Sequence, residues 1–204
     1  MRGPRSLPDL SKGSIIDIPS GAPDGVLHSA TPALCEKSRG DGRQTSSIIC
    51  KITPIISTDY QKIVCELLRG AHRSIDICAY TWKWYAHQSG CLMQQINRTI
   101  IEKARQGVKV RVRLNSEQKD HYLTKENSLT SNALRRYPIL TKFDNTGTTS
   151  HLKMIIIDNE IVIIGSHNLT KRSVSQNHET SVAIYGEEAC RDFVKYFGNL
   201  WIVR

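Results

Sequence analysis

Beyond about residue 50, the chain repeats apolar side chains at the spacings of regular secondary structure. In the stretches 58–70 and 91–107 these residues fall on one helical stripe, and each stretch ends at a glycine. Strict alternation of apolar and polar residues predicts strands over 74–80 and 108–115. This half of the chain therefore alternates helix and strand.

The second half continues with short elements and a hairpin. The predicted elements are a helix over 126–136, a strand over 139–143, a hairpin over 151–165, a polar loop over 170–177, a strand over 179–186 and a helix over 187–200. Helix–strand alternation followed by a hairpin predicts an α/β fold in which helices sandwich a mixed β-sheet.

The first 50 residues have a different composition. They contain five prolines and six glycines, with no sustained apolar periodicity. Such a segment cannot bury enough apolar surface to offset the entropy of the chain. We therefore expect residues 1–50 to form a flexible N-terminal arm and residues 51–204 to form one domain.

The domain is basic, and its cysteines are scattered. Of the net charge of +9, residues 51–204 carry +8, from 22 basic and 14 acidic residues. A basic globular part indicates a polyanionic partner such as nucleic acid or an anionic membrane surface. The six cysteines form no metal-ligand pattern, and neither a membrane span nor a secretory signal is evident. These features predict a cytoplasmic protein whose thiols are free.

Four polar side chains flank the predicted hairpin, in the stretch HLKMIIIDNEIVIIGSHN (151–168). Because side chains alternate along a strand, His151 and Lys153 share one face, and so do Ser166 and Asn168. The hairpin brings the two pairs to one end of the sheet. An imidazole can serve as a nucleophile or as a proton donor at neutral pH. The other three groups can hold the charge that grows on a phosphodiester during its cleavage.

The spacing of these residues resembles the HxK(x)4D(x)6GSxN signature of the phospholipase D superfamily at every defined position, with Asp158 as the acid. A further carboxylate, Glu179, stands where single-motif members of the superfamily have an Asn-x-Glu stretch. The resemblance covers about residues 55–200 and is strongest to bacterial single-motif endonucleases. It implies a phospholipase D-like fold.

The resemblance also implies a two-histidine reaction without a metal ion or other cofactor. One His151 would attack phosphorus and form a phosphohistidine, while a second His151 would protonate the leaving oxygen and later activate water. The chain has one motif, so the second histidine would come from a second copy in a homodimer.

The remaining roles are also carried over from the resemblance. Lys153 and Asn168 would bind phosphoryl oxygens, and Ser166 would hydrogen-bond in the same pocket. Glu179 would orient an imidazole, and Asp158 would support the pocket structurally or electrostatically. His167 and His178 occupy variable positions of the pattern and are expected to be non-catalytic.

The sequence leaves the substrate open. Lys171 and Arg172 follow the motif and favour binding of nucleic acid phosphates, and therefore a DNA or RNA endonuclease. Two alternatives are a hydrolase of an anionic phospholipid such as cardiolipin, acting at a membrane surface, and a non-catalytic nucleic-acid-binding module. The pairs Arg111/Arg113 and Trp82/Trp84 fit either substrate contacts or structural roles: ion pairs for the arginines, and a place in the core or a dimer interface for the tryptophans.

Overall fold

Seven strands form one mixed sheet in the computed structural model of the chain, which describes residues 48–86, 90–117, 121–144 and 147–202. The strands are β1 (Lys51–Ile56), β2 (Ser74–Ala79), β3 (Lys109–Asn115), β4 (Ile139–Asp144), β5 (Lys153–Ile157), β6 (Ile161–Gly165) and β7 (Thr180–Tyr185). The helices are α1 (Asp59–Arg69), α2 (Leu92–Arg105), α3 (His121–Leu134), α4 (Lys171–Ser175) and α5 (Glu187–Ile202). The arm predicted for residues 1–50 lies almost wholly outside the described residues.

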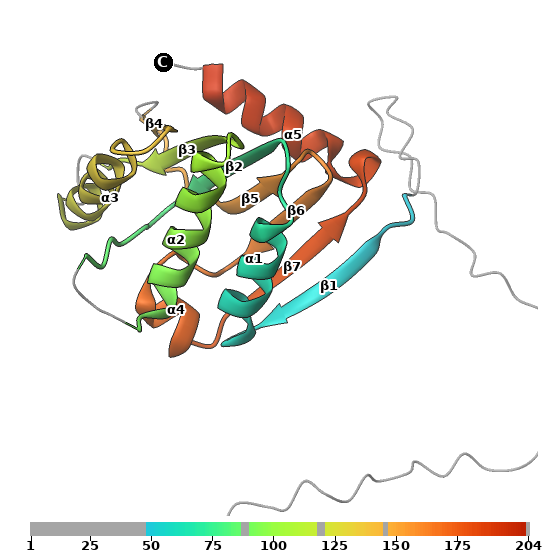
Figure 1. Cartoon of the computed structure of the whole chain (residues 1–204), viewed down its shortest axis with the longest axis horizontal. Helices are drawn as coiled ribbons and strands as arrows, with labels where there is room; N and C mark the ends of the chain where they lie inside the picture. The colour runs from blue at the N-terminus through green and yellow to red at the C-terminus, as the bar shows by residue number, and fades with distance from the viewer. Residues whose placement is uncertain (1–47, 87–89, 118–120, 145–146, 203–204) are drawn as a thin grey trace, which may run out of the picture. The chain divides into compact units, whose positions relative to one another are not determined.

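The strand order is β1-β7-β6-β5-β2-β3-β4 (Figure 1). The β2, β3 and β4 strands are parallel, because helical crossovers join them, whereas β5, β6 and β7 run antiparallel to their neighbours. The predicted mixed α/β fold is therefore confirmed.

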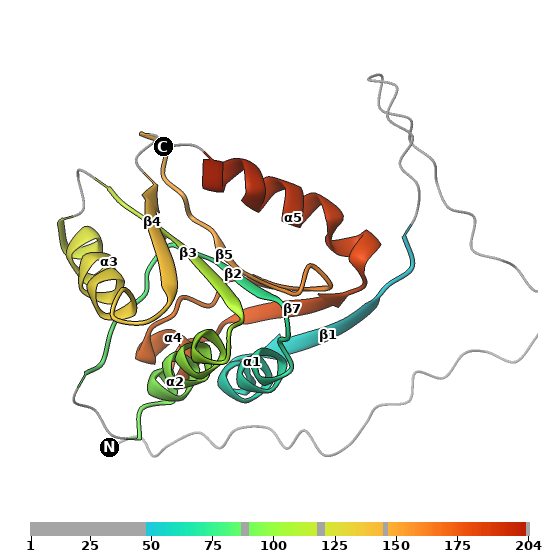
Figure 2. The same cartoon turned by 45° about the horizontal axis from the view of Figure 1, so that its top comes forward.

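Helices cover both faces of the sheet, with α1, α2 and α3 on one face and α5 on the other (Figure 2). Because successive side chains of a strand point to opposite faces of the sheet, each strand contributes apolar residues to the hydrophobic cores on both faces. On β5, for example, Ile155 packs in the larger cluster with α1 and α2, while Met154 and Ile156 pack in the smaller cluster with Phe197 of α5. No helix in the described part of the chain is long and apolar enough to cross a membrane.

Three elements differ from the sequence prediction. The β1 strand was not predicted; it is an edge strand and contains Pro54, which such a position tolerates. The α3 helix begins at His121 rather than near 126, because its buried side includes polar residues that hide the helical period. Residues 171–175, predicted as loop, form the short helix α4, where the Thr170 side chain accepts a hydrogen bond from the Ser173 N–H.

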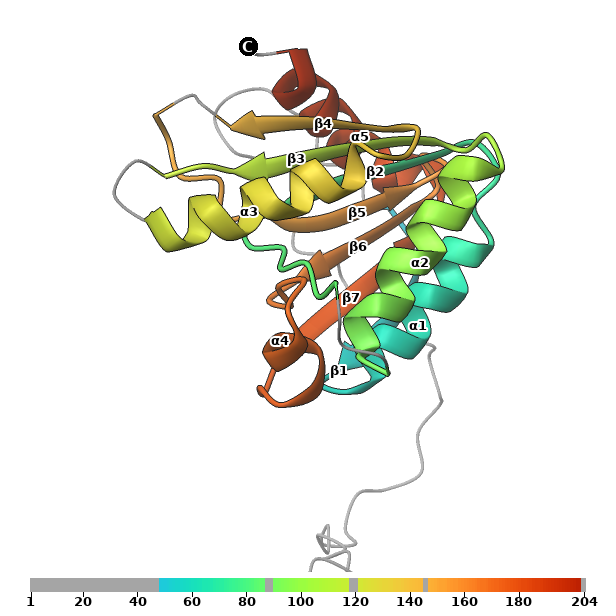
Figure 3. The same cartoon turned by 60° about the vertical axis from the view of Figure 1, so that its left-hand side comes forward.

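The sheet also determines where the motif lies. Lys153 is the first residue of β5, and Gly165 is the last residue of the antiparallel β6, so both stand at one end of the hairpin (Figure 3). Lys153 pairs with Ala79 at the carboxyl end of β2. Ligands of open α/β sheets commonly bind at the carboxyl ends of the parallel strands, and the motif lies there.

Candidate active site

His151 and Lys153 form one cluster with an aromatic ring that sequence reasoning did not select. The Lys153 ammonium lies 3.1 Å from Nδ1 and 3.3 Å from Nε2 of His151, and it donates to the His151 carbonyl at 3.0 Å. The Tyr80 ring packs 4.2 Å from the imidazole, centroid to centroid, and the ammonium lies 4.7 Å from the Tyr80 ring centre. Tyr80 directly follows β2, and that position at a strand end is the signal that was available. The cluster holds an exposed imidazole beside a half-buried cation.

The surroundings of Lys153 shift the pKa of its ammonium group. Burial lowers the pKa of Lys153, and the negative charge of Glu179 opposes part of this shift. Lys153 thus lies within the electrostatic reach of Glu179, which begins the segment leading into β7. The sheet brings these two groups together from positions 26 residues apart in the sequence.

Ser166 and Glu179 are joined directly. The Ser166 hydroxyl donates to the Glu179 carboxylate, and it also accepts from the Thr180 N–H at 3.1 Å. Two further donors, Ser173 Oγ at 3.1 Å and Asn177 Nδ2 at 3.0 Å, bind the other carboxylate oxygen. Burial by itself would raise the pKa of Glu179, but these three hydrogen bonds lower it overall.

One contact expected of Glu179 is not formed among the described residues, so its role toward an imidazole stays a prediction. The sequence reading gave Glu179 the task of orienting an imidazole, yet in the described residues its carboxylate is bound to Ser166, Ser173 and Asn177 and has no hydrogen bond to His151. Lys153 and Tyr80 are the side chains shown in contact with the His151 ring. Asn177 is the first residue of the Asn-x-Glu stretch but was given no role, and Ser173 was missed because it lies outside any motif.

Asn168 is held at the edge of the same site. Its N–H donates to Ser173 Oγ at 2.8 Å, which fixes the backbone after β6. Its side-chain Oδ1 is buried without a hydrogen-bond partner among the described residues. Unpaired buried polar atoms are uncommon and often mark functional sites. Lys171 and Arg172 follow on α4 with exposed side chains.

Gly165 allows this close packing. A Cβ atom at position 165 would collide with the backbone of Thr180 and Ser181 on β7. Glycine therefore lets β6 and β7 approach where Ser166 meets Glu179.

Asp158 does not belong to this pocket, which corrects the expectation that it supports the pocket. It lies in the β5–β6 turn, at the opposite end of the hairpin from Lys153. Its carboxylate accepts from the N–H groups of His72 at 2.8 Å, Arg73 at 2.7 Å and Ser74 at 2.7 Å. Asp158 therefore fastens the hairpin to the loop between α1 and β2.

The other histidines of the motif region have different settings. His167 is buried, with Nδ1 2.8 Å from Ser181 Oγ, Nε2 3.0 Å from the Ser57 carbonyl oxygen, and its ring stacked on Tyr60 at 4.2 Å. Burial lowers the pKa of His167, although the Ser57 carbonyl and Glu179 act in the opposite direction. This setting gives His167 a structural role, while His178 is exposed.

The residues that the sequence left open have clear structural partners. Arg111 makes two hydrogen bonds of 2.6 Å to Asp76, and Arg113 pairs with Asp144 at 3.1 Å. Both arginines are therefore neutralised within the fold. Trp82 is fully buried and donates to Asn97, whereas Trp84 is half-buried.

A single chain forms only a shallow site. The hollow lined by Lys153, Asn168 and Tyr80 measures about 10 Å³, roughly the space of one water molecule. His151 stands exposed beside it. No group of three or more His, Cys, Asp or Glu side chains in the described ranges could hold a metal ion.

Known proteins resemble this chain in sequence and in fold. The family described as "Cardiolipin synthase, PLD-like domain" matches residues 64–201. A mitochondrial cardiolipin hydrolase of Chlamydomonas reinhardtii is 26% identical over 136 residues, which are 67% of this chain and 55% of that protein. The chain thus spans little more than half the length of this relative.

Two solved structures share the fold. NucT from Helicobacter pylori has a TM-score of 0.59 at 18% identity, covering 75% of this chain and 96% of its own. The phospholipase D family member Nuc from Salmonella typhimurium has a TM-score of 0.63 at 20% identity, covering 75% and 95%. At these identities the likeness establishes the architecture.

Proposed function

This chain belongs to the phospholipase D-like family, and on that basis we propose that it is a metal-independent phosphodiesterase that cleaves nucleic acid. The reaction proceeds through a phosphohistidine on His151, in a site completed by a second copy of the chain. One observation carries the proposal: an exposed imidazole lies against a lysine ammonium at the carboxyl end of the sheet, where Asn168 and Ser166 also converge.

The first step transfers the phosphoryl group to the enzyme. A ring nitrogen of His151 attacks phosphorus, the bond from phosphorus to the leaving oxygen breaks, and that oxygen takes a proton from the imidazolium of the second copy's His151. Lys153 and the Asn168 carboxamide stabilise the charge on the nonbridging oxygens.

The second step regenerates the enzyme. The second copy's His151, now neutral, takes a proton from water as the water oxygen attacks phosphorus. The phosphorus–nitrogen bond breaks, and a phosphate monoester leaves. Ser166 and Glu179 form a connected hydrogen-bond network that keeps the loop after β6 in place during both steps.

The shallow single-chain site supports the homodimer. A hollow of about 10 Å³ encloses no phosphodiester, and the other imidazole that lines it, His167, is buried with its ring nitrogens at Ser181 and Ser57. A symmetric pair would bring two copies of His151 together across a two-fold axis. The site would then be enclosed by both chains.

The basic surface beside the motif supports nucleic acid as the substrate. Lys171 and Arg172 are exposed at the start of α4, without ion pairs among the described residues, next to Asn168. Exposed cations at this position suit the phosphates that flank the scissile bond.

A second candidate is hydrolysis of an anionic phospholipid. The observation favouring it is that the curated relative in Chlamydomonas is named a cardiolipin hydrolase. Both substrates are phosphodiesters, so the same His151 chemistry would serve either.

The test is an assay of the full chain on plasmid DNA, single-stranded DNA, RNA and cardiolipin vesicles, each in excess EDTA, with His151→Ala as the matched control. We expect nucleic acid cleavage that survives chelation and disappears in the variant. Cleavage restricted to cardiolipin would favour the second candidate. Activity abolished by EDTA, or retained by His151→Ala, would contradict the mechanism.

A further inference from the structure

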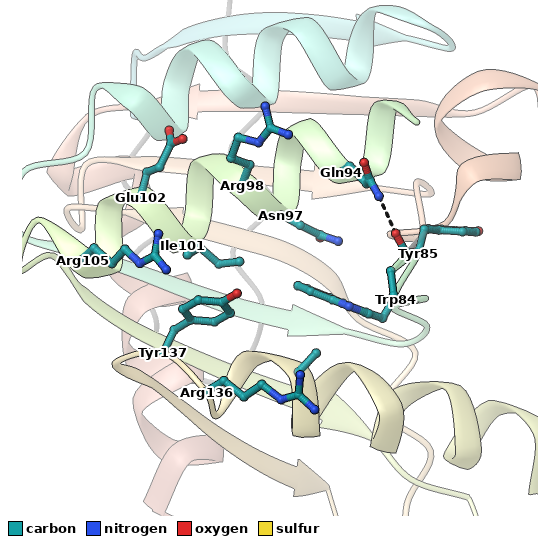
Figure 4. Close-up of a pocket in the computed structure, with 12 residues that line it drawn as sticks. Trp84, Tyr85, Gln94, Asn97, Arg98, Ile101, Glu102, Arg105, Arg136 and Tyr137 are labelled. Carbon is teal, nitrogen blue, oxygen red and sulfur yellow. Dashed lines mark hydrogen bonds between the residues drawn. The ribbon is translucent and has the colours of Figure 1, made fainter. Parts of the chain in front are cut away.

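A hollow of about 610 Å³ lies away from His151, between α2 and the turn that follows α3 (Figure 4). We call it the α2–α3 groove. Trp84 and Tyr85, from the segment between β2 and α2, close one end, while Arg105 of α2 and Tyr137 lie toward the other. The chemistry proposed at His151 leaves this groove without a role.

The lining combines aromatic rings with guanidinium groups. Trp84 and Tyr137 are half-buried, so each ring keeps one part in the core and exposes another part to the groove. The guanidinium carbon of Arg105 lies 5.0 Å from the centre of the Tyr137 ring. Arg136 projects from the turn next to Tyr137 (Figure 4).

The charge of the groove is unbalanced. Arg98, Arg105 and Arg136 line it, all exposed, against one acidic residue, Glu102. None of these arginines has an ion pair among the described residues. In contrast, Arg111 and Arg113 in the sheet are each paired with an aspartate. Uncompensated arginines in a hollow attract an anionic ligand.

The groove adjoins the catalytic loop. The Lys171 N–H donates to the Tyr85 hydroxyl at 2.8 Å, and the Lys83 N–H donates to the Leu169 carbonyl at 3.0 Å. Leu169 directly follows Asn168 of the motif. A chain of phosphodiesters leaving His151 would therefore pass α4 and enter the groove at Tyr85.

We propose that the α2–α3 groove binds single-stranded nucleic acid on one side of the bond cleaved at His151. Bases stack on Trp84 and Tyr137, and phosphates pair with Arg105 and Arg136. This inference rests on the proposed nuclease function and adds the strand state of the substrate. Bases are exposed for stacking only in a single strand, and aromatic–arginine surfaces bind such strands with little sequence preference.

The groove is poorly suited to lipid. The exposed large apolar side chains of the described residues, such as Tyr122 and Leu129 of α3, do not line it. Acyl chains would need such a surface, whereas a nucleic acid strand needs the rings and cations that are present.

The first measurement is strand binding in the His151→Ala background, which prevents cleavage. Fluorescence anisotropy follows a labelled oligothymidylate on the full chain, with and without Arg105→Gln and Arg136→Gln. We expect the double variant to bind about tenfold more weakly. The slope of log association constant against log salt concentration should also become shallower by about 1.4, because two phosphate contacts to a single strand are lost. The matched control, Arg191→Gln with Lys195→Gln on α5, removes the same charge from the opposite face and leaves the affinity unchanged.

Two further variants separate binding from folding. Trp84→Leu removes one stacking ring and is expected to weaken strand binding about tenfold. Arg136→Gln alone tests the groove without disturbing the Arg105–Tyr137 contact, should the double variant fail to fold. Unchanged strand affinity in folded groove variants would overturn the inference. Equal losses of affinity for single strands, for duplex DNA and for cardiolipin vesicles would overturn it as well.

A separate measurement distinguishes failure of the groove proposal from failure of the proposed catalytic function. With His151 intact, hydrolysis of bis(4-nitrophenyl) phosphate, which is too small to reach the groove, should be unchanged by Arg105→Gln and Arg136→Gln. Absence of any hydrolysis by the unmodified protein would count against the catalytic proposal, while strand binding would still decide the role of the groove.

Discussion

The Lys153 ammonium lies 3.1 Å from Nδ1 of His151, so the first residue of β5 holds the imidazole that precedes the strand. The same ammonium contacts the His151 carbonyl and lies over the Tyr80 ring. These contacts hold the imidazole beside a cation, which we propose binds a phosphoryl oxygen.

Replacing Lys153 by Met should remove this cation while keeping the stem. Because the ammonium stabilises charge that grows in the transition state, we expect kcat to fall about 10²- to 10³-fold. Steady-state kinetics on bis(4-nitrophenyl) phosphate measure the change. Lys153→Arg, which keeps the charge but changes its geometry, should retain more activity than Lys153→Met. Equal rates for the Met variant and the unmodified protein would contradict the assignment.

Tyr80→Leu tests whether the ring positions the imidazole. Loss of the ring leaves His151 free to adopt other rotamers, and misplacement of a catalytic group is expected to lower kcat about ten- to a hundredfold. KM should change less than kcat, because Tyr80 acts through His151. Tyr80→Phe keeps the ring and should retain most of the activity. A purely structural role for Tyr80 would instead lower the melting temperature and leave kcat of the folded fraction intact.

Asp158→Asn should affect stability rather than catalysis. The substitution removes the charge that accepts three backbone N–H groups, and we expect a loss of about 2 kcal/mol in the free energy of unfolding. Urea denaturation provides the measurement. At urea concentrations below the unfolding transition, the activity should remain near that of the unmodified protein. A large loss of kcat would instead indicate that Asp158 takes part in catalysis.

The Asp158 carboxylate should also make the stability of the fold depend on pH in the acidic range. Burial by itself would raise the pKa of Asp158, but hydrogen bonds from Ser74, His72 and Arg73 lower it below its ordinary 3.8. A group with a lowered pKa stabilises the fold above its ordinary value and loses that contribution as the pH falls through the folded-state value. Asp158→Asn should therefore lose less stability below pH 4 than the unmodified protein does.

His167→Gln tests the buried histidine. Burial lowers the pKa of His167 below its ordinary 6.5, so the unfolded chain takes up the proton first. This contribution to stability is complete above pH 6.5 and declines as the pH falls through the folded-state value. The melting temperature of the unmodified protein should thus drop more steeply between pH 7 and 5 than that of His167→Gln. Exposed His178→Gln is the matched control, and equal slopes in all three proteins would contradict the assignment.

Much of the fold was predictable because the large apolar clusters follow simple periods. Alternation predicted β2 and β3, and helical spacing predicted α1 and α2, since each element buries one regular face. The α3 helix was harder, because Asn127 and Thr130 on its buried side form hydrogen bonds to backbone atoms. These polar residues are buried because distant segments of the chain supply their hydrogen-bond partners, and the spacing of apolar residues along the sequence cannot reveal such partners.

The candidate site was predictable where it lies on the motif and not elsewhere. The antiparallel pairing of β5 with β6 puts Lys153 and Gly165 at one end of the hairpin, next to the other polar residues of the motif, as the sequence predicted. The motif did not show that Asp158 stands at the other end of β5, because fixed spacing is compatible with both a catalytic and a structural aspartate. The α2–α3 groove joins segments distant in sequence and emerges only from the structure.

The most direct test of the account uses mixed dimers of unmodified and His151→Ala chains, purified through two different affinity tags. Because each site is proposed to need a histidine from both copies, the mixed dimer should be inactive on bis(4-nitrophenyl) phosphate, while the doubly tagged unmodified dimer is active. Half of the unmodified activity in the mixed dimer, or full activity in an isolated single chain, would contradict the shared site.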